Sequence, residues 1–148
     1  MMNYSFKFQN ILQLKEREKD EVQSAYNESV KKFEEVAEKL YLLLKRKEDL
    51  IDFQESRLVS GFSVYEIQHN QQFISNLEKT IEYQQQLVMN ARGQLQWYEQ
   101  QLQEKNMELK KYEKIKEKDF ERFKEKAKQE EYKEMDDLSV IQYMNRGN

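Results

Sequence analysis

The sequence predicts an all-α protein, a long two-helix antiparallel coiled-coil hairpin that turns near Gly61. Charged residues make up 36% of the 148 residues, proline is absent and glycine occurs only three times. A compact globule needs more apolar residues and more turn residues than this. Aromatic residues make up 12% of the chain, which is too many for a disordered one. A long helix with a narrow apolar seam explains both the polar composition and the aromatic content. Heptad spacing of apolar residues along the chain is the third observation that predicts this fold.

The second half of the chain carries the clearer heptad pattern. One column, spaced by seven residues, is aliphatic at every position: Ile67, Ile74, Ile81, Val88, Leu95, Leu102 and Leu109. The companion column is mixed: Asn70, Leu77, Gln84, Ala91, Tyr98, Lys105 and Tyr112. Apolar columns sustained over this many heptads indicate a coiled coil. The polar members of the second column are of the kind that fixes register at a cost in stability.

The first half shows a looser apolar pattern with a similar spacing. Its expected seam residues are Phe8, Leu12, Val22, Tyr26, Phe33, Leu40, Leu44, Ile51 and Leu58. Lys15 and Lys19 interrupt this pattern. We therefore expect the open end of the hairpin to be less stable than the end near the turn.

Stop and start signals for a helix lie side by side around Gly61. Gly61 suits the left-handed position just past a helix end, and Ser63 with Glu66 forms a capping box that starts a new helix. We expect one elongated domain, residues 1–148, with helix one over about 7–59, a turn over 60–63 and helix two over about 64–131. The stretch 132–148 is expected to be a short helix or a tail that orders on a partner. Gly93 is expected to soften helix two rather than end it.

Composition also limits the classes of partner. The net charge is −3 with both signs interleaved, so no basic stripe for nucleic acid is predicted. The basic run over 45–47 is followed at once by two acidic residues, and we interpret it as a solvated face. No apolar run approaches the ~20 residues of a membrane span, so we expect no membrane insertion. The lack of cysteine suits a reducing cytoplasm.

The sequence offers almost no material for catalysis. His69 is the one histidine, and no cluster with metal-ligand spacing or phosphate-binding loop is present. We therefore predict no enzyme, no cofactor and no metal. The informative residues are large aromatics off the seam, since exposed aromatics anchor interfaces. Phe73 has two interpretations, an edge residue over the seam or a partner contact, and Phe62 is either a staple onto helix two or a contact at the turn. Tyr83 and Trp97 share one outward column and are further candidates for partner binding.

Three segments of the sequence resemble the flagellar export protein FliJ family. The central segment runs from Gly61-Phe62-Ser63 through Gln71-Gln72-Phe73-Ile74 to Leu77-Glu78-Lys79 and Ile81. The opening segment, Phe6-Lys7-Phe8-Gln9 with Leu12, Leu14-Lys15-Glu16 and Glu18-Lys19-Asp20, is similar to members from Gram-positive bacteria. Met135-Asp136-Asp137 resembles the acidic motif near the end of these proteins.

The resemblance implies a soluble component of the flagellar type III export apparatus, similar in shape to the paired terminal helices of the rotary ATPase gamma subunit. Its implied partners are the hexameric export ATPase, the cytoplasmic domain of the transmembrane export gate, and export chaperones. The implied location is the cytoplasm, peripherally at the inner face of the cell membrane at the flagellar base. Gate contact carries over to Phe73 and Leu77, whereas Thr80 departs from the small apolar residue of the family. The implied ATPase contact is residues 7–19 and 110–128.

Two other classes of function also fit the residues. A structural coiled coil would self-associate into longer bundles, and a holdase of the two-helix prefoldin type would bind many unfolded clients. Sedimentation separates the first from a monomeric hairpin, and selective binding to one ATPase and one gate protein argues against the second.

Overall fold

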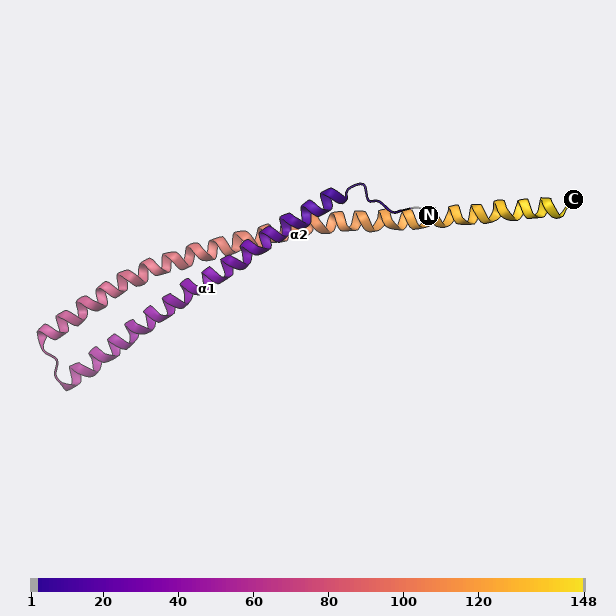
Figure 1. Ribbon diagram of the computed structural model, residues 1–148. Coiled ribbons are helices and arrows are strands. Elements are labelled where there is room, and N and C mark those ends of the chain that lie inside the picture. The colour runs from indigo at the N-terminus through magenta and orange to yellow at the C-terminus, as the bar shows by residue number, and fades with distance from the viewer. Residues whose placement is uncertain (1–2, 148) are drawn as a thin grey trace. The chain divides into compact units, whose positions relative to one another are not determined.

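The computed structural model describes residues 3–147, which form two long helices and no strand (Figure 1). Helix α1 spans Gln9–Ser60 and helix α2 spans Val64–Arg146. The predicted all-α helical hairpin is therefore confirmed. Helix α2 is continuous through Gly93 and includes most of the stretch 132–148 that the sequence left as a short helix or a tail. No proline or glycine interrupts α2 after Gly93 until Gly147, so no residue there stops the helix.

The turn between the helices forms as its sequence signals predict. Gly61 has a φ of 101°, a left-handed conformation that costs a residue with a Cβ atom more than it costs glycine. The backbone N–H of Glu66 donates to Ser63 Oγ at 3.1 Å, which is one half of the capping box. Chain reversal therefore takes only the three residues between α1 and α2.

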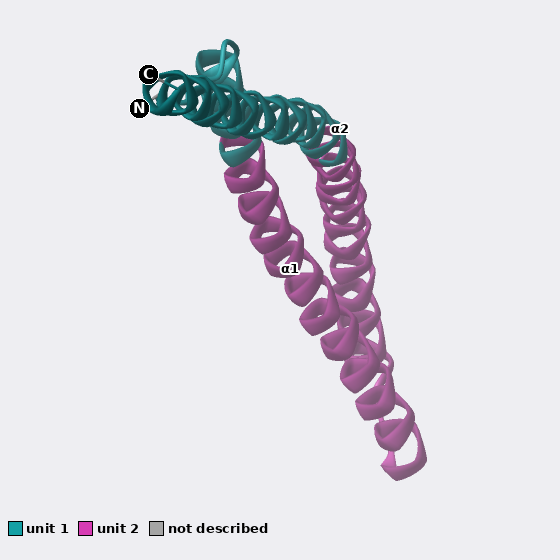
Figure 2. Cartoon of the chain, turned by 90° about the vertical axis from the view of Figure 1, so that its right-hand side faces the viewer, with its two compact units in different colours: residues 1–20, 103–148 teal, residues 21–102 magenta. Residues whose placement is uncertain are grey.

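The chain divides into two compact units, and both helices contribute to each (Figure 2). Unit 1 comprises residues 1–20 and 103–148, and unit 2 comprises residues 21–102. The sequence predicted one elongated domain. The single-domain assignment stays a prediction.

In unit 2 the two helices pack antiparallel along the predicted heptad columns of α2. Ile74, Leu77, Ile81, Gln84 and Ala91 are buried on this face. Asn70 Nδ2 donates to Gln54 Oε1 at 3.0 Å, and Gln84 Nε2 donates to the carbonyl oxygen of Val36 at 3.0 Å. Both helices rise equally per residue, so paired residues are expected to have numbers that add up to about 122 for a turn at Gly61, and these pairs agree with that register.

The apolar face of α1 in unit 2 differs from the predicted one. The sequence placed Leu44, Ile51 and Leu58 in the seam, but these side chains are exposed. Leu40 is half-buried, as predicted, and so are Leu43 and Leu50 of the column beside it; these three leucines face α2. The prediction was wrong for Leu44, Ile51 and Leu58 because α1 carries apolar residues in adjacent columns, and spacing alone does not choose between them.

In unit 1 a small apolar core lies beside a ring of charges. Phe6, Leu12 and Leu109 form the buried cluster, and Tyr4 and Tyr112 pack against it. The ring alternates in sign: Lys15–Glu108 at 3.1 Å, Lys15–Glu18 at 3.6 Å, Lys105–Glu18 at 3.2 Å and Lys105–Glu108 at 3.9 Å. Lys15 and Lys105, which interrupt the apolar columns, thus take part in ion pairs between the helices.

Candidate functional site

The two residues of the implied gate contact lie one turn apart on α2 but in different environments. Phe73 is 43% exposed, whereas Leu77 is 8% exposed and belongs to the seam with α1. Residues four apart on a helix share a face, so a partner that covers Phe73 reaches the edge of the Leu77 side chain. The exposed ring supplies contact area, and the buried leucine fixes the helix that carries it.

Phe73 has a cationic neighbour on α1. The guanidinium carbon of Arg46 lies 5.4 Å from the centre of the Phe73 ring. Lys45 and Arg46 are exposed, as the interpretation of residues 45–47 as a solvated face predicts, whereas Lys47 is half-buried and pairs with Glu78 at 3.4 Å. The sequence did not predict the Arg46–Phe73 and Lys47–Glu78 contacts, because each joins a residue of α1 to a residue of α2.

Phe62 in the turn packs back onto the end of α1. Its ring meets Phe53 edge-to-face at a centroid distance of 6.2 Å, and the Arg57 guanidinium carbon lies 5.5 Å from its centre. Phe53 and Arg46 are seven residues apart and so lie on one edge of α1. We name the resulting set, near the turn in unit 2, the aromatic patch: Arg46, Phe53, Arg57, Phe62 and Phe73. Sequence reasoning found Phe62 and Phe73 and missed the two arginines and Phe53.

Tyr83 and Trp97 are exposed on α2, as their shared outward column predicts. Trp97 packs edge-to-face on its neighbour Tyr98 at 5.0 Å, which leaves most of the indole open. Neither belongs to the aromatic patch as defined by contacts. His69 is also exposed and stacks with Tyr65 at 6.4 Å.

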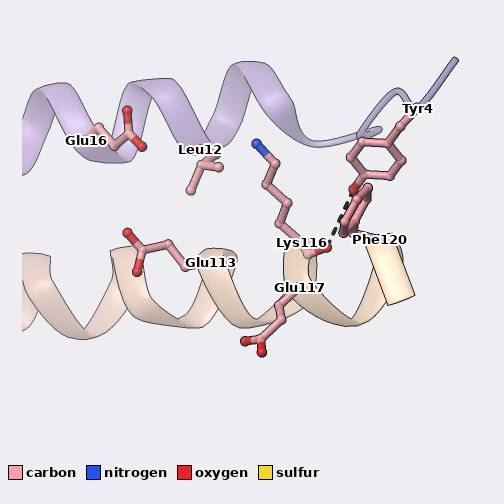
Figure 3. A pocket seen from close by; sticks show the side chains of 7 residues that line it. All are labelled: Tyr4, Leu12, Glu16, Glu113, Lys116, Glu117 and Phe120. Atoms are coloured by element: carbon pink, nitrogen blue, oxygen red, sulfur yellow. Dashed lines mark hydrogen bonds between the residues drawn. The ribbon is translucent and has the colours of Figure 1, made fainter. Parts of the chain in front are cut away.

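A second candidate surface is a pocket in unit 1, which we name the N-terminal pocket. It has a volume of about 520 Å³. Its lining residues are Tyr4, Leu12, Glu16, Glu113, Lys116, Glu117 and Phe120. Figure 3 shows Glu16 of α1 and Glu113 of α2 facing each other, with Tyr4 and Phe120 together at the other end. Apolar surface bordered by three carboxylates suits an aliphatic or basic side chain of a partner.

Tyr4 holds the segment before α1 against α2. Its ring packs on Phe120 and Phe123 at centroid distances of 4.9 and 5.2 Å, and its hydroxyl donates to Asp119 at 3.1 Å. Burial and this hydrogen bond to Asp119 raise the pKa of Tyr4 above its usual value. The sequence prediction began at residue 7 and missed this anchor, although alternating aromatics at Tyr4, Phe6 and Phe8 were a visible signal.

The ion-pair ring of unit 1 perturbs two of its members. The hydrogen bond from Lys105 is the main cause that lowers the pKa of Glu18, and the hydrogen bond to Glu108 is the main cause that raises the pKa of Lys15. Both shifts favour the charged forms of these two side chains, Glu18 and Lys15.

Neither surface has the parts of a metal centre. Within residues 3–147, no group of three or more His, Cys, Asp or Glu side chains is arranged to hold a metal ion. Over the same residues, neither helix has a window apolar enough for a bilayer crossing. The exposed groups described above are instead aromatic rings, guanidinium groups and carboxylates.

Comparison with known proteins gives the chain its family. The profile of the family described as Flagellar FliJ protein matches residues 4–148. The chain belongs to the FliJ family. A relative from Bacillus subtilis (strain 168), also named Flagellar FliJ protein, is 49% identical over 146 residues, which is 99% of each chain. No solved structure matches the chain. Family membership supports a role in the flagellar export apparatus, the class of function that the sequence resemblance implied.

Proposed function

We propose that this chain is a non-catalytic adaptor of the flagellar type III export apparatus. It binds the hexameric export ATPase through unit 1 and the cytoplasmic domain of the export gate through unit 2, and it escorts export chaperones. It acts in the cytoplasm, peripherally at the inner face of the cell membrane at the flagellar base. Family membership supports the apparatus, and the exposure of Phe73 is the observation that supports the gate contact.

The gate contact centres on the aromatic patch. An aromatic ring flanked by guanidinium groups is the composition that dominates binding energy at protein interfaces. Phe73 offers such a ring within the Gln71-Gln72-Phe73 motif, with Arg46 beside it. Leu77 contributes through the seam that supports the ring. Phe62 lies in the same patch, whereas Tyr83 and Trp97 form a separate outward column suited to a second partner such as a chaperone.

The ATPase contact uses the surfaces of unit 1. The ranges 7–19 and 110–128 contain every lining residue of the N-terminal pocket except Tyr4: Leu12, Glu16, Glu113, Lys116, Glu117 and Phe120. A carboxylate-bordered apolar pocket favours basic or aliphatic side chains of the ring. Salt weakens such contacts, because partly exposed charges are screened.

The test for the gate contact is binding of the full chain to the purified cytoplasmic domain of the gate by titration calorimetry. Phe73→Ala is expected to weaken binding by about tenfold or more, the effect of a hot-spot aromatic. Tyr143→Ala, which removes a more exposed ring in unit 1 (80% against 43% for Phe73), serves as the control and is expected to bind like the unaltered chain. Undiminished binding by Phe73→Ala would show that Phe73 is not the contact.

The adaptor role itself is tested with the unaltered chain. It is expected to bind both the gate domain and the export ATPase and to sediment as a monomer. Binding to neither protein, or sedimentation as a stable dimer or tetramer, would replace the adaptor with a self-associating structural coiled coil.

A further inference from the structure

Helix α1 carries an apolar column that its pairing with α2 does not cover. Leu40, Leu43 and Leu50 face α2, while the next column around the helix, Ala37, Leu44, Ile51 and Leu58, continues the apolar surface outward. Leu58 is 53% exposed and Leu44 is 42% exposed. A two-stranded coiled-coil seam needs only two columns, so the third column leaves apolar surface that α2 does not cover.

The column beyond it is acidic. Its members, spaced by seven, are Glu34, Tyr41, Glu48 and Glu55, and all four are exposed. We name the two columns together the acidic stripe: Glu34, Ala37, Tyr41, Leu44, Glu48, Ile51, Glu55 and Leu58. Its members are spaced alternately by three and four residues, which is the spacing of a helix surface that packs against another helix.

The carboxylates of the stripe are not neutralised by contacts within the described residues. Glu34, Glu48 and Glu55 make no ion pair there, and the nearby Lys47 already pairs with Glu78. The next column outward balances itself: Lys31, Glu38, Lys45 and Asp52. The stripe therefore presents apolar side chains together with uncompensated negative charge.

We propose that the acidic stripe is a docking surface for a basic amphipathic helix of a partner protein. Aliphatic side chains of that helix cover Leu44, Ile51 and Leu58, and lysine or arginine side chains meet the glutamates. A second copy of the stripe does not fit, since a symmetric contact would place carboxylates against carboxylates. The stripe spans about 36 Å of α1 at 1.5 Å per residue, so it receives a helix of about seven turns.

The acidic stripe is a different surface from the aromatic patch. Arg46 and Phe53 lie on the edge of α1 beyond the Leu43 column, and the stripe lies beyond the Leu40 column on the other edge. A partner on the stripe therefore leaves Phe73 and Arg46 accessible. Two partners can occupy unit 2 together.

The probe is a synthetic peptide of about four heptads with leucine at one heptad position, lysine at the position that meets Glu34, Glu48 and Glu55, and alanine or glutamine elsewhere. A control peptide carries glutamate in place of lysine. Binding of each to the full chain is measured by fluorescence anisotropy at two salt concentrations. The lysine peptide is expected to bind at least tenfold more tightly, with an affinity that falls as salt rises.

Charge exchange on the chain decides where the peptide binds. Glu48→Lys with Glu55→Lys is expected to weaken the lysine peptide at least tenfold and to restore binding of the glutamate peptide. The matched control, Glu35→Lys with Asp49→Lys, changes the net charge equally on the opposite face of α1 and is expected to change affinity less than twofold. Far-ultraviolet circular dichroism confirms that both variants remain helical.

Three results would overturn the proposal. Equal weakening by the two double variants would indicate attraction to the net charge alone. Equal binding of the two peptides would remove the role of the glutamates. Sedimentation of the unaltered chain as a dimer that Leu44→Ser with Leu58→Ser dissociates would show that a second copy covers the stripe.

Discussion

Gln84 provides the sharpest test of how polar seam residues act in unit 2. Its side chain is 2% exposed, and its Nε2 donates to the carbonyl oxygen of Val36, an oxygen that also lies within the α1 backbone ladder. Replacing Gln84 by leucine removes one net hydrogen bond, a loss of about 0.5–1.5 kcal/mol. The leucine buries apolar atoms at the same site, a gain of about 1.5–3 kcal/mol. Because Val36 keeps its helical partner, no buried group is left unsatisfied.

Gln84→Leu is therefore expected to raise the free energy of unfolding by about 1 kcal/mol. Gln84→Ala loses the hydrogen bond and leaves a void, so it is expected to lower the free energy by about 1–2 kcal/mol. Urea titration followed by circular dichroism at 222 nm measures both. The order leucine, glutamine, alanine supports the reasoning. A leucine variant less stable than the unaltered chain would refute it and show that the polar contact is required for packing.

Three further predictions concern single positions. Leu77→Ala is expected to lower the free energy of unfolding by about 2–3 kcal/mol because the site is buried. Phe73→Ala is expected to lower it by about 1 kcal/mol, through partial burial and a lost cation–π contact. Equal losses in urea titrations would contradict the environments assigned to the two residues. Gly93→Ala is expected to stabilise α2 by about 1 kcal/mol, since a Cβ atom there meets nothing within 4 Å. Gly61→Ala is expected to destabilise the turn by about 1 kcal/mol because φ is positive there. Melting temperatures that move in the same direction for both variants would contradict this. The lowered pKa of Glu18 stabilises the folded state above the unfolded pKa of about 4.3, and this contribution is lost as pH falls through the folded pKa. A Glu18→Gln variant is therefore expected to lose less stability in acid than the unaltered chain. Identical profiles of stability against pH would argue against the ion-pair ring.

The sequence alone predicted the helix pair, the turn and the face of α2. Strict spacing at seven residues left one choice for α2, and Gly61 with Ser63 left one place for the reversal. Helix α1 was harder, since leucines occur at Leu40, Leu43 and Leu44, and which of them faces inward depends on the partner helix.

Members of the candidate surfaces could be singled out from the sequence where one helix or the turn carries the signal, and not where a contact joins the two helices. Phe73 and Phe62 were identified because an aromatic residue off the seam is visible in the sequence. The contact of Arg46 with Phe73 was missed, since it joins residues that only the register of the helix pair brings together. Tyr4 was missed because it precedes the helix, where heptad spacing does not apply.

The last turns of α2 have a consequence for the lifetime of the protein. From residue 128 to Arg146 every side chain is exposed, including the large apolar side chains of Leu138, Val140, Ile141, Tyr143 and Met144. A helical segment without a packed face opens readily, and opened apolar segments are where proteases cut. We expect a partner that covers this segment to slow degradation of the chain. The amount of protein in the cell would then follow the amount of assembled complex.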